Sequence, residues 1–407
     1  MNYKLYVRDQ YFRKVVPITD YKSLKMLLKF NASSTWEIIL PTDCEATKEL
    51  YNTKAGIIVK RNNVTILSGT VNKSSRSFSR DEDTITFSGF DDTHLLENIA
   101  SPVPNGASFS TQEYDVRTGV AETIMKQYAD VNIGQNAQSV RKIHNLINSV
   151  DKGLGKTVTG RARFHKLMEL FQSLALSGGD LGFKIAQSGD NLEFQVYQPT
   201  DKTKIAVFSP LLGNLLDFEY NIEKPKANYI IVGGGGEGTE RLFVEGGDNE
   251  SIAKYSRMEL FVDQRNTTDI AELKQTLEEE LANNIEQTSL SITPNDTENL
   301  AFGRDYNLGD KVSVIITQPN EVIDVETLYY FISAYQSAPF EVERVRKIQE
   351  KISVVEDVVR EVNLTITPTG ESISPVVGTP DSLSSVVPKI YKNVDKLTKR
   401  INKLERR

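Results

Sequence analysis

Residues 56–67 read Gly56-Ile57-Ile58-Val59-Lys60-Arg61-Asn62-Asn63-Val64-Thr65-Ile66-Leu67, two apolar, β-branched runs on either side of a polar corner. β-Branched residues favour strands because they pack well on a pleated surface. Asparagine tolerates a positive φ angle, so the pair Asn62-Asn63 is typical of a tight turn between antiparallel strands. The stretch therefore predicts a β-hairpin and indicates a β-sheet fold for the beginning of the chain.

The flanking sequence extends this β pattern over residues 1–100. Trp36–Leu40 and Thr84–Phe87 partly alternate apolar with polar residues, as half-buried strands do. Asp91-Asp92 then offers an N-cap for a short helix that runs through His94. We therefore expect a β domain over residues 1–100, closed by a short helix.

Residues 101–200 have a different pattern, typical of a small α+β domain. Val116, Val120, Ile124 and Tyr128 recur every four residues and predict an amphipathic helix. A second helix is expected over about Phe164–Leu176, ended by Gly178-Gly179. The segments 183–186 and 192–197, separated by Ser188-Gly189-Asp190, predict a hairpin.

Residues 201–380 are expected to form a second β domain that contains one long helix, 268–286, and an aromatic insertion, 318–351. Loops longer than about 15 residues are uncommon and are either functional or structured. The aromatic residues of the insertion could bind a sugar or a partner protein, or could form the insertion's own small core. They are Tyr329, Tyr330, Phe331, Tyr335 and Phe340.

The two β regions share a weak internal similarity. Gly56–Val59, Leu67–Val71 and Thr84–Phe87 follow one another in the first region as a strand, a hairpin partner and a closing strand. The segments that repeat this order in the second region are Gly309–Val314, Val358–Val362 and Leu364–Thr367. The similarity suggests two related β domains.

Residues 381–407 predict a C-terminal coiled-coil helix. Its apolar residues are spaced alternately by three and four positions, as in a heptad repeat. The predicted oligomerisation seam has Val387, Val394 and Ile401 at position a and Ile390, Leu397 and Leu404 at position d. An amphipathic helix lying on its own domain is the alternative. The seam predicts an oligomer without setting the number of chains.

Composition limits the possible functions. The net charge is −7, from 55 acidic against 48 basic residues, which argues against strong nucleic-acid binding. No apolar run is long enough for a signal peptide or a membrane anchor, so we expect the protein to be made in a cytoplasm. Cys44 is the only cysteine, which excludes an internal disulfide and a cysteine-rich zinc site.

No catalytic or cofactor motif is complete, and we expect no cofactor, no metal and no enzymatic activity. Gly153–Thr157 resembles the end of a P-loop but lacks its first glycine, and Gly233–Gly238 is followed by a predicted strand where a dinucleotide site needs a helix. His94, His144 and His165 are too scattered for a metal site. Helix capping explains Asp91-Asp92 better than a cation does. Paired carboxylates leave no local signature, so a glycosidase-like pair stays open.

Six further segments follow one another in order along the chain: Tyr114–Gly119, Thr157–Phe164, Phe194–Tyr197, Tyr229–Gly234, Phe302–Asp310 and Glu361–Pro368. Together they resemble the baseplate hub proteins of siphophage tails, a family that includes the N-terminal part of tail-associated lysins. The resemblance covers roughly residues 1–380 and departs at the insertion 318–351 and in the coiled-coil tail.

This resemblance implies a mostly β, α+β chain in which two related β-barrel domains, 1–100 and 201–380, flank the domain 101–200. It further implies a homotrimer that forms a pseudo-sixfold ring at the tail tip of the virion. Such a ring adapts the tail tube to the tip, and DNA passes without specific binding. The implied partners are the distal tail protein, the tail tube, the tape-measure protein and receptor-binding or spike proteins. In lysin-bearing relatives a hydrolase domain follows the hub; here the coiled coil follows, so we expect no lytic domain. The alternatives are a tail-associated cell-wall hydrolase and a host-surface binding module that uses the aromatic insertion.

Overall fold

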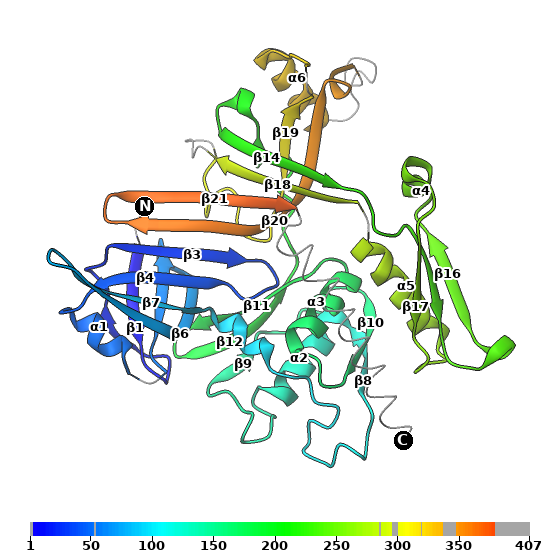
Figure 1. Cartoon of the computed structure of the whole chain (residues 1–407), viewed down its shortest axis with the longest axis horizontal. Coiled ribbons are helices and arrows are strands. Elements are labelled where there is room, and N and C mark those ends of the chain that lie inside the picture. Colours follow the sequence, from blue (N-terminus) through cyan, green and yellow to red (C-terminus); the bar gives the residue numbers. More distant parts are fainter. Residues whose placement is uncertain are drawn as a thin grey trace.

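The computed structural model describes residues 3–52, 54–284, 286–294, 300–318, 320–336 and 347–378. Strands dominate these residues and form four sheets, the largest of which has 13 strands. Figure 1 shows this sheet above the helices α2 (Ala121–Asn132) and α3 (Leu167–Ser177), with a separate small sheet to one side. No helix in the described part of the chain is long and apolar enough to cross a membrane.

The first half of the large sheet comes from the N-terminal region. The predicted hairpin is confirmed, because Asn62 and Asn63 adopt φ angles of 50° and 67° between two paired strands. The helix α1 (Glu45–Leu50) packs beside these strands. The strands are β1 (Tyr3–Arg8), β2 (Lys14–Pro17), β3 (Ser23–Lys29), β4 (Thr35–Pro41), β5 (Gly56–Arg61), β6 (Val64–Phe78) and β7 (Asp83–Phe90).

The second half of the large sheet comes from the C-terminal region. The helix α6 (Val325–Gln336) lies in the connection between two of its strands and belongs to the predicted insertion. The strands are β13 (Val207–Phe208), β14 (Leu215–Glu223), β18 (Gln287–Pro294), β19 (Lys311–Thr317), β20 (Ile352–Thr367) and β21 (Gly370–Gly378).

The two halves repeat the same five-strand arrangement. In space the first half runs β3-β4-β7-β6-β5 and the second runs β14-β18-β21-β20-β19, with every neighbouring pair antiparallel. The chain also visits the corresponding strands in the same order. The predicted internal similarity is therefore present, with one correction: Leu364–Thr367 is part of β20, and the strand equivalent to β7 is β21.

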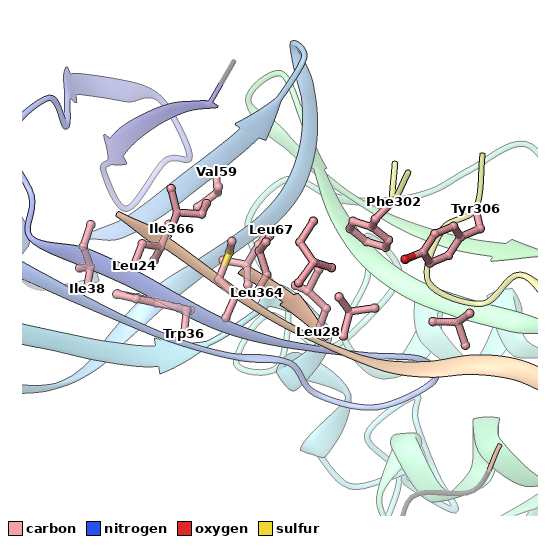
Figure 2. Packing of buried hydrophobic residues seen from close by; sticks show 14 of the residues in the cluster. Leu24, Leu28, Trp36, Ile38, Val59, Leu67, Phe302, Tyr306, Leu364 and Ile366 are labelled. Carbon is pink, nitrogen blue, oxygen red and sulfur yellow. The ribbon is translucent and has the colours of Figure 1, made fainter. Parts of the chain in front are cut away.

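The halves are joined edge to edge by antiparallel pairing of β20 with β3. Side chains of both halves share one hydrophobic core, and Figure 2 shows Leu364 and Ile366 of β20 beside Leu24 and Leu28 of β3. No sheet of the described residues closes on itself, so the two predicted β-barrels are not confirmed. In the first half the physical reason is that β20 occupies the outer edge of β3, the edge that β3 would need to close this half. In the second half the corresponding strand, β14, pairs only with β18 among the described residues, so this half stays open.

In the sequence, the two halves are separated by a compact α+β unit with its own core, which we call the middle unit. Val116 and Val120 belong to a strand and not to the predicted helix, because residues four apart also face the same side of a strand. The helix itself, α2, begins at Ala121. The other elements are η1 (Asp92–Glu97), β8 (Asp115–Val120), β9 (Leu146–Asn148), β10 (Thr157–Ala162), β11 (Gly182–Ser188) and β12 (Asn191–Tyr197).

A small three-stranded sheet is inserted between β14 and β18, where the first half has only a short connection. The helix α5 (Ile270–Asn284) covers one face of this sheet, with Leu273 fully buried in the contact. This helix lies inside the stretch 268–286 for which the sequence predicts a helix. The other elements are β15 (Tyr229–Gly233), β16 (Phe243–Gly247), α4 (Asn249–Tyr255) and β17 (Glu259–Asp263).

Candidate functional site

The strand junction that unites the two halves is the central feature of the large sheet. Residues 24–29 of β3 pair with residues 361–366 of β20, and alternate side chains point to opposite faces. On one face Leu24, Met26 and Leu28 are buried in the shared core. On the other face Lys29 forms an ion pair of 3.3 Å with Glu361. The junction therefore combines a continuous core with a charge pair that marks the register.

The face opposite the core is hollowed into a shallow groove of about 560 Å³ along the junction. Its lining combines apolar groups with residues of both charges, as with Lys25 and Glu37, whose charged groups lie 3.9 Å apart. The Nε1 group of Trp36 donates a hydrogen bond of 3.2 Å to the carbonyl of Phe90 at the groove floor. The groove extends across both halves and carries both charges, with Lys25 and Lys73 against Glu37.

Two strand edges of the large sheet have no second partner among the described residues. The outer part of β6, Val71–Phe78, pairs only with β7, and β14 pairs only with β18. Phe78 at the end of β6 is 76% exposed and Phe218 on β14 is 39% exposed. Free edges present backbone donors and acceptors that can pair with another strand. These edges are therefore candidate assembly surfaces.

A buried polar network fastens the first half to the middle unit. Arg8, fully buried on β1, donates a hydrogen bond of 2.8 Å to the carboxylate of Asp92 and another of 2.8 Å to Gln187 on β11. Its guanidinium also lies 5.1 Å from the ring centre of Phe12. The Ser68 hydroxyl donates to the same carboxylate at 2.6 Å. Asp92 therefore acts as the centre of an interface between units.

The predicted capping role of Asp91 and Asp92 is wrong. Asp91 sits at the N-cap position of η1 but makes no side-chain cap hydrogen bond there. Its carboxylate instead accepts a hydrogen bond of 3.0 Å from the backbone N–H of Ser34. Burial raises the pKa of Asp91 to about 7, with the neighbouring Asp92 acting in the same direction. Both carboxylates therefore bind residues that are distant in the sequence, and local spacing does not reveal such partners.

A pocket of about 210 Å³ lies between the middle unit and helix α5 of the small sheet. Arg161 on β10 donates a hydrogen bond of 3.0 Å to Glu272 on α5. The side chain of Gln275 accepts a hydrogen bond of 3.0 Å from the backbone N–H of Thr159 and donates one of 3.1 Å to the carbonyl of the same residue. Glu279 accepts from the hydroxyl of Ser173 at 3.0 Å. These contacts attach the small sheet to the middle unit.

Three titratable groups of this pocket, Glu279, Glu169 and His165, have pKa values shifted toward their neutral forms. Burial raises the pKa of Glu279, although hydrogen bonds from Gln275 and Ser173 oppose the shift. Burial also raises the pKa of Glu169 and lowers the pKa of His165. Across the described residues, no group of three or more His, Cys, Asp or Glu is placed to hold a metal ion. The pocket is therefore a contact region between the middle unit and α5 that contains two half-buried carboxyl groups.

Four of the five aromatic residues of the insertion, Tyr329, Tyr330, Phe331 and Tyr335, belong to α6. Phe331 is fully buried in a small core with Leu328 and Ile348, and Tyr330 packs against that core. Tyr329 points outward and is 59% exposed. The side chain of Tyr335, the residue Phe340 and the whole predicted seam lie outside the described residues. The seam comprises Val387, Ile390, Val394, Leu397, Ile401 and Leu404.

The free edge of β6 is the surface that the sequence did not indicate. Asn72–Phe78 contains serine and charged residues without apolar alternation, and every one of its side chains is exposed. A strand without a buried face has no period-two signal. Only its pairing with β7 makes it a strand, so no local pattern could have identified it.

Comparison with known proteins gives one family and several structures. The profile of the family described as Siphovirus ReqiPepy6 Gp37-like protein matches residues 4–338. Among proteins of curated function, no match is found.

Three solved structures share the fold along almost their whole length. The 43 kDa tail protein of prophage MuSo2 from Shewanella oneidensis has a TM-score of 0.53 at 13% identity, covering 92% of this chain and 97% of that chain. A tail protein from Neisseria meningitidis MC58 has a TM-score of 0.56 at 10% identity, covering 93% and 97%. The prophage tail protein gp18 from Listeria monocytogenes EGD-e has a TM-score of 0.52 at 10% identity, covering 96% and 99%. At these identities the likeness establishes the fold.

Proposed function

The chain belongs to the Siphovirus ReqiPepy6 Gp37-like protein family, and we propose that it is a structural hub at the tail tip of a long-tailed bacteriophage. Three copies would form a pseudo-sixfold ring that adapts the tail tube to the tip and lets DNA pass through the centre. The protein would be part of the virion and would be made in the host cytoplasm. The fold it shares with tail proteins supports this placement.

The observation that carries the proposal is the repeated five-strand arrangement in the two halves of the large sheet. Two equivalent halves in each chain would give a trimer six equivalent units, which matches a threefold tip to a sixfold tube. The halves already meet edge to edge within one chain through β3 and β20. A ring needs the same kind of edge contact between chains, because heterologous contacts close when the rotation per unit fits.

The groove face of the junction would form the wall of the DNA channel. Lys25, Glu37 and Lys73 give this face both charges, and the whole chain carries a net charge of −7. Strong binding of DNA requires clustered basic residues that neutralise phosphates. A mixed-charge wall would hold phosphates weakly, so that DNA passes without specific binding.

The remaining surfaces would contact neighbouring tail proteins. The distal tail protein and the tail tube would bind one side of the ring, receptor-binding or spike proteins the other, and the tape-measure protein the channel. Tyr329 is an exposed aromatic residue of α6 that is available for a contact with a neighbouring tail protein or with the host surface. Tyr329→Ala should weaken host adsorption without loss of assembled tails, if the insertion binds the host surface. Impaired tail assembly would indicate a contact inside the tail instead.

The C-terminal seam would strengthen the ring as a coiled coil. Leu397 and Ile401 belong to positions d and a of the predicted heptads. Replacing both by Asp should loosen the oligomer and leave the unfolding of the large sheet unchanged. Analytical ultracentrifugation that shows the same oligomer for both proteins would exclude this role for the seam.

The experiment that tests the hub is a direct image of the assembled protein. Cryo-electron microscopy of the purified chain, or of the tail tip that contains it, should show threefold symmetry with six similar sheets around an axial channel. Analytical ultracentrifugation should give three times the mass of one chain. A monomer at all concentrations, together with its absence from the tail tip, would reject the hub.

The two half-buried carboxyl groups in the pocket beside α5 favour cell-wall hydrolysis as the second candidate function. Hydrolases use a carboxyl group with a raised pKa as a general acid. Glu169 and Glu279 both have this property. If the chain is a hydrolase, purified protein should clear peptidoglycan, and Glu169→Gln or Glu279→Gln should abolish the clearing. If it is only a hub, neither the protein nor the variants should clear it.

A further inference from the structure

The strands β6 and β20 can be aligned residue by residue where they pair with β7 and β21, because both contain the same irregularity. β6 has a bulge between Val71 and Lys73 where it pairs with β7. β20 has a bulge between Val359 and Glu361 where it pairs with β21. Aligning the bulges makes Lys73 equivalent to Glu361. Counting along the strand then makes Phe78 equivalent to Ile366.

The same alignment continues through the sheet to the other strand of the junction. Gly89 of β7 corresponds to Val377 of β21, because each lies opposite the first residue of its bulge. Gly89 pairs with Trp36, which in turn pairs with Met26. In the same way, Val377 pairs with Leu290, which in turn pairs with Tyr220. β14 is therefore the counterpart of β3. Its residues equivalent to Leu24, Lys25 and Lys29 are Phe218, Glu219 and Glu223.

The counterparts of the junction strands are both edge strands in a single chain. Within the chain, β20 pairs with β3 through residues 361–366. The equivalent segment of β6, residues 73–78, has no partner on that side among the described residues, and β14 is the last strand at its end of the sheet. Each chain therefore has one free copy of each strand that makes the internal junction.

The side chains at these free edges repeat the chemistry of the internal junction with the charges exchanged. Where Lys29 and Glu361 form an ion pair of 3.3 Å, the free edges carry Glu223 and Lys73. A Glu–Lys pair on opposite strands is favourable in either direction. The exchanged pair supplies charge complementarity between the two edges.

The apolar positions at the far end of the junction correspond as well. Leu24 is fully buried and Ile366 is 3% exposed within the chain. Their counterparts, Phe218 and Phe78, are 39% and 76% exposed. Two phenyl rings brought together across a strand pair would each lose water contact and would gain a favourable aromatic contact. Both edges therefore present an exposed aromatic residue where the internal junction has core.

We propose that the occupant of each edge is a second copy of this chain, with β6 of one copy pairing antiparallel to β14 of the next. The register places Lys73 opposite Glu223, Ser77 opposite Glu219 and Phe78 opposite Phe218. Because one copy offers β6 and its neighbour offers β14, the contact is heterologous and can close into a ring. This pairing rests on the proposed hub and gives it a partner and a register. Main-chain hydrogen bonds would supply strength and the three side-chain pairs specificity.

A charge exchange tests the register. Lys73→Glu and Glu223→Lys should each place like charges opposite one another and weaken association roughly fivefold at each junction. The double variant should restore association, because it recreates the pair in the opposite order. Arg80→Glu, on the same hairpin but outside the proposed register, is the matched control and should leave association unchanged. Analytical ultracentrifugation measures the oligomer, and circular dichroism confirms that each variant is folded.

Cysteine cross-linking supplies a second measurement that does not depend on affinity. In a Cys44→Ser background, Ser77→Cys with Glu219→Cys should form disulfides between copies on mild oxidation, because directly opposite residues have Cβ atoms about 4.5–5.5 Å apart. Ser77→Cys with Asp217→Cys, two residues out of register, should remain largely uncross-linked.

The outcomes separate this pairing from the hub itself. Cross-linking of the in-register pair together with rescue by the double charge variant supports the pairing. An intact trimer that neither cross-links in register nor responds to the charge variants overturns the pairing and leaves the hub standing. A chain that stays monomeric under all conditions overturns both.

Discussion

Lys29 of β3 and Glu361 of β20 form an ion pair of 3.3 Å across the junction that joins the two halves of the large sheet. Their side chains are 21% and 8% exposed, so the pair lies largely out of water. A slip of one residue between these strands would turn their buried side chains to the other face. The pair and the core beneath it therefore specify the same register.

Removing the cation of this pair should destabilise the sheet. Lys29→Met leaves the carboxylate of Glu361 buried without its partner, so we expect a loss of about 1–3 kcal/mol in the free energy of unfolding. Urea denaturation measures it. Lys25→Met is the matched control, because its ion pair with Glu37 is long and exposed and should contribute little. Equal losses in both variants would contradict a special role for Lys29.

The buried pair of Arg8 and Asp92 should contribute more to the free energy of unfolding than the pair of Lys29 and Glu361. Arg8→Met leaves Asp92, which is 4% exposed, without a cation, and we expect a loss of about 3–5 kcal/mol in the free energy of unfolding. Arg13→Met provides the comparison, because Arg13 is 62% exposed in its ion pair with Asp9 and its removal should have no measurable effect. Denaturation of the two variants side by side gives the result. A stable Arg8→Met protein would show that packing alone holds the units together.

Asp91 should make stability depend on pH. Its pKa is raised from 3.8 to about 7 in the folded protein, chiefly by burial. The folded protein therefore keeps a proton that the unfolded chain releases, and the stability from this group is present below about pH 4 and lost as the pH rises to about 7. Asp91→Asn should remove this loss, so the variant should gain stability relative to the original protein between pH 4 and 7. Thermal unfolding across this range checks it; a constant difference would contradict the raised pKa.

Two substitutions by small residues in the turn at Asn62-Asn63 should have different effects on the stability of the protein. Asn62→Ala places a side chain that disfavours positive φ at a φ of 50°, and we expect a loss of about 1 kcal/mol. Asn63→Gly meets a φ of 67° without steric cost and should leave stability nearly unchanged. Melting temperatures of the two variants test the difference. If both variants melt alike, the turn is not strained.

Gln275 should control how firmly the small sheet is attached. Gln275→Ala removes both hydrogen bonds to the backbone of Thr159, so hydrogen exchange in α5 should accelerate while exchange in α3 stays unchanged. Lys274→Ala, its exposed neighbour on the same helix, is the matched control. Mass spectrometry of peptides from both helices provides the measurement. Faster exchange in both helices would indicate a general loss of stability instead.

Sequence reasoning failed where one spacing fits two structures or where the partner is distant. Val116 and Val120 are four residues apart, a spacing that a helix face and a strand face share, and pairing of β8 with β10 made the strand. Asp91 and Asp92 occupy a capping position in sequence, yet Ser34 and Arg8 bind them in the fold. Neither the partner strand β10 nor the partners of the two carboxylates can be read from the local sequence.

The sequence by itself determined the local elements, because their causes lie within a few residues. The hairpin at Asn62-Asn63 follows from tolerance of positive φ, and the stripe of α5 follows from helical periodicity. No local pattern of residues predicted the candidate assembly surfaces, which are the edges of β6 and β14. The tertiary structure alone decided that β20 pairs with β3 and that β6 and β14 remain at the edges. Every residue except proline carries the same backbone donor and acceptor, so the side-chain pattern predicts a strand without naming its neighbour.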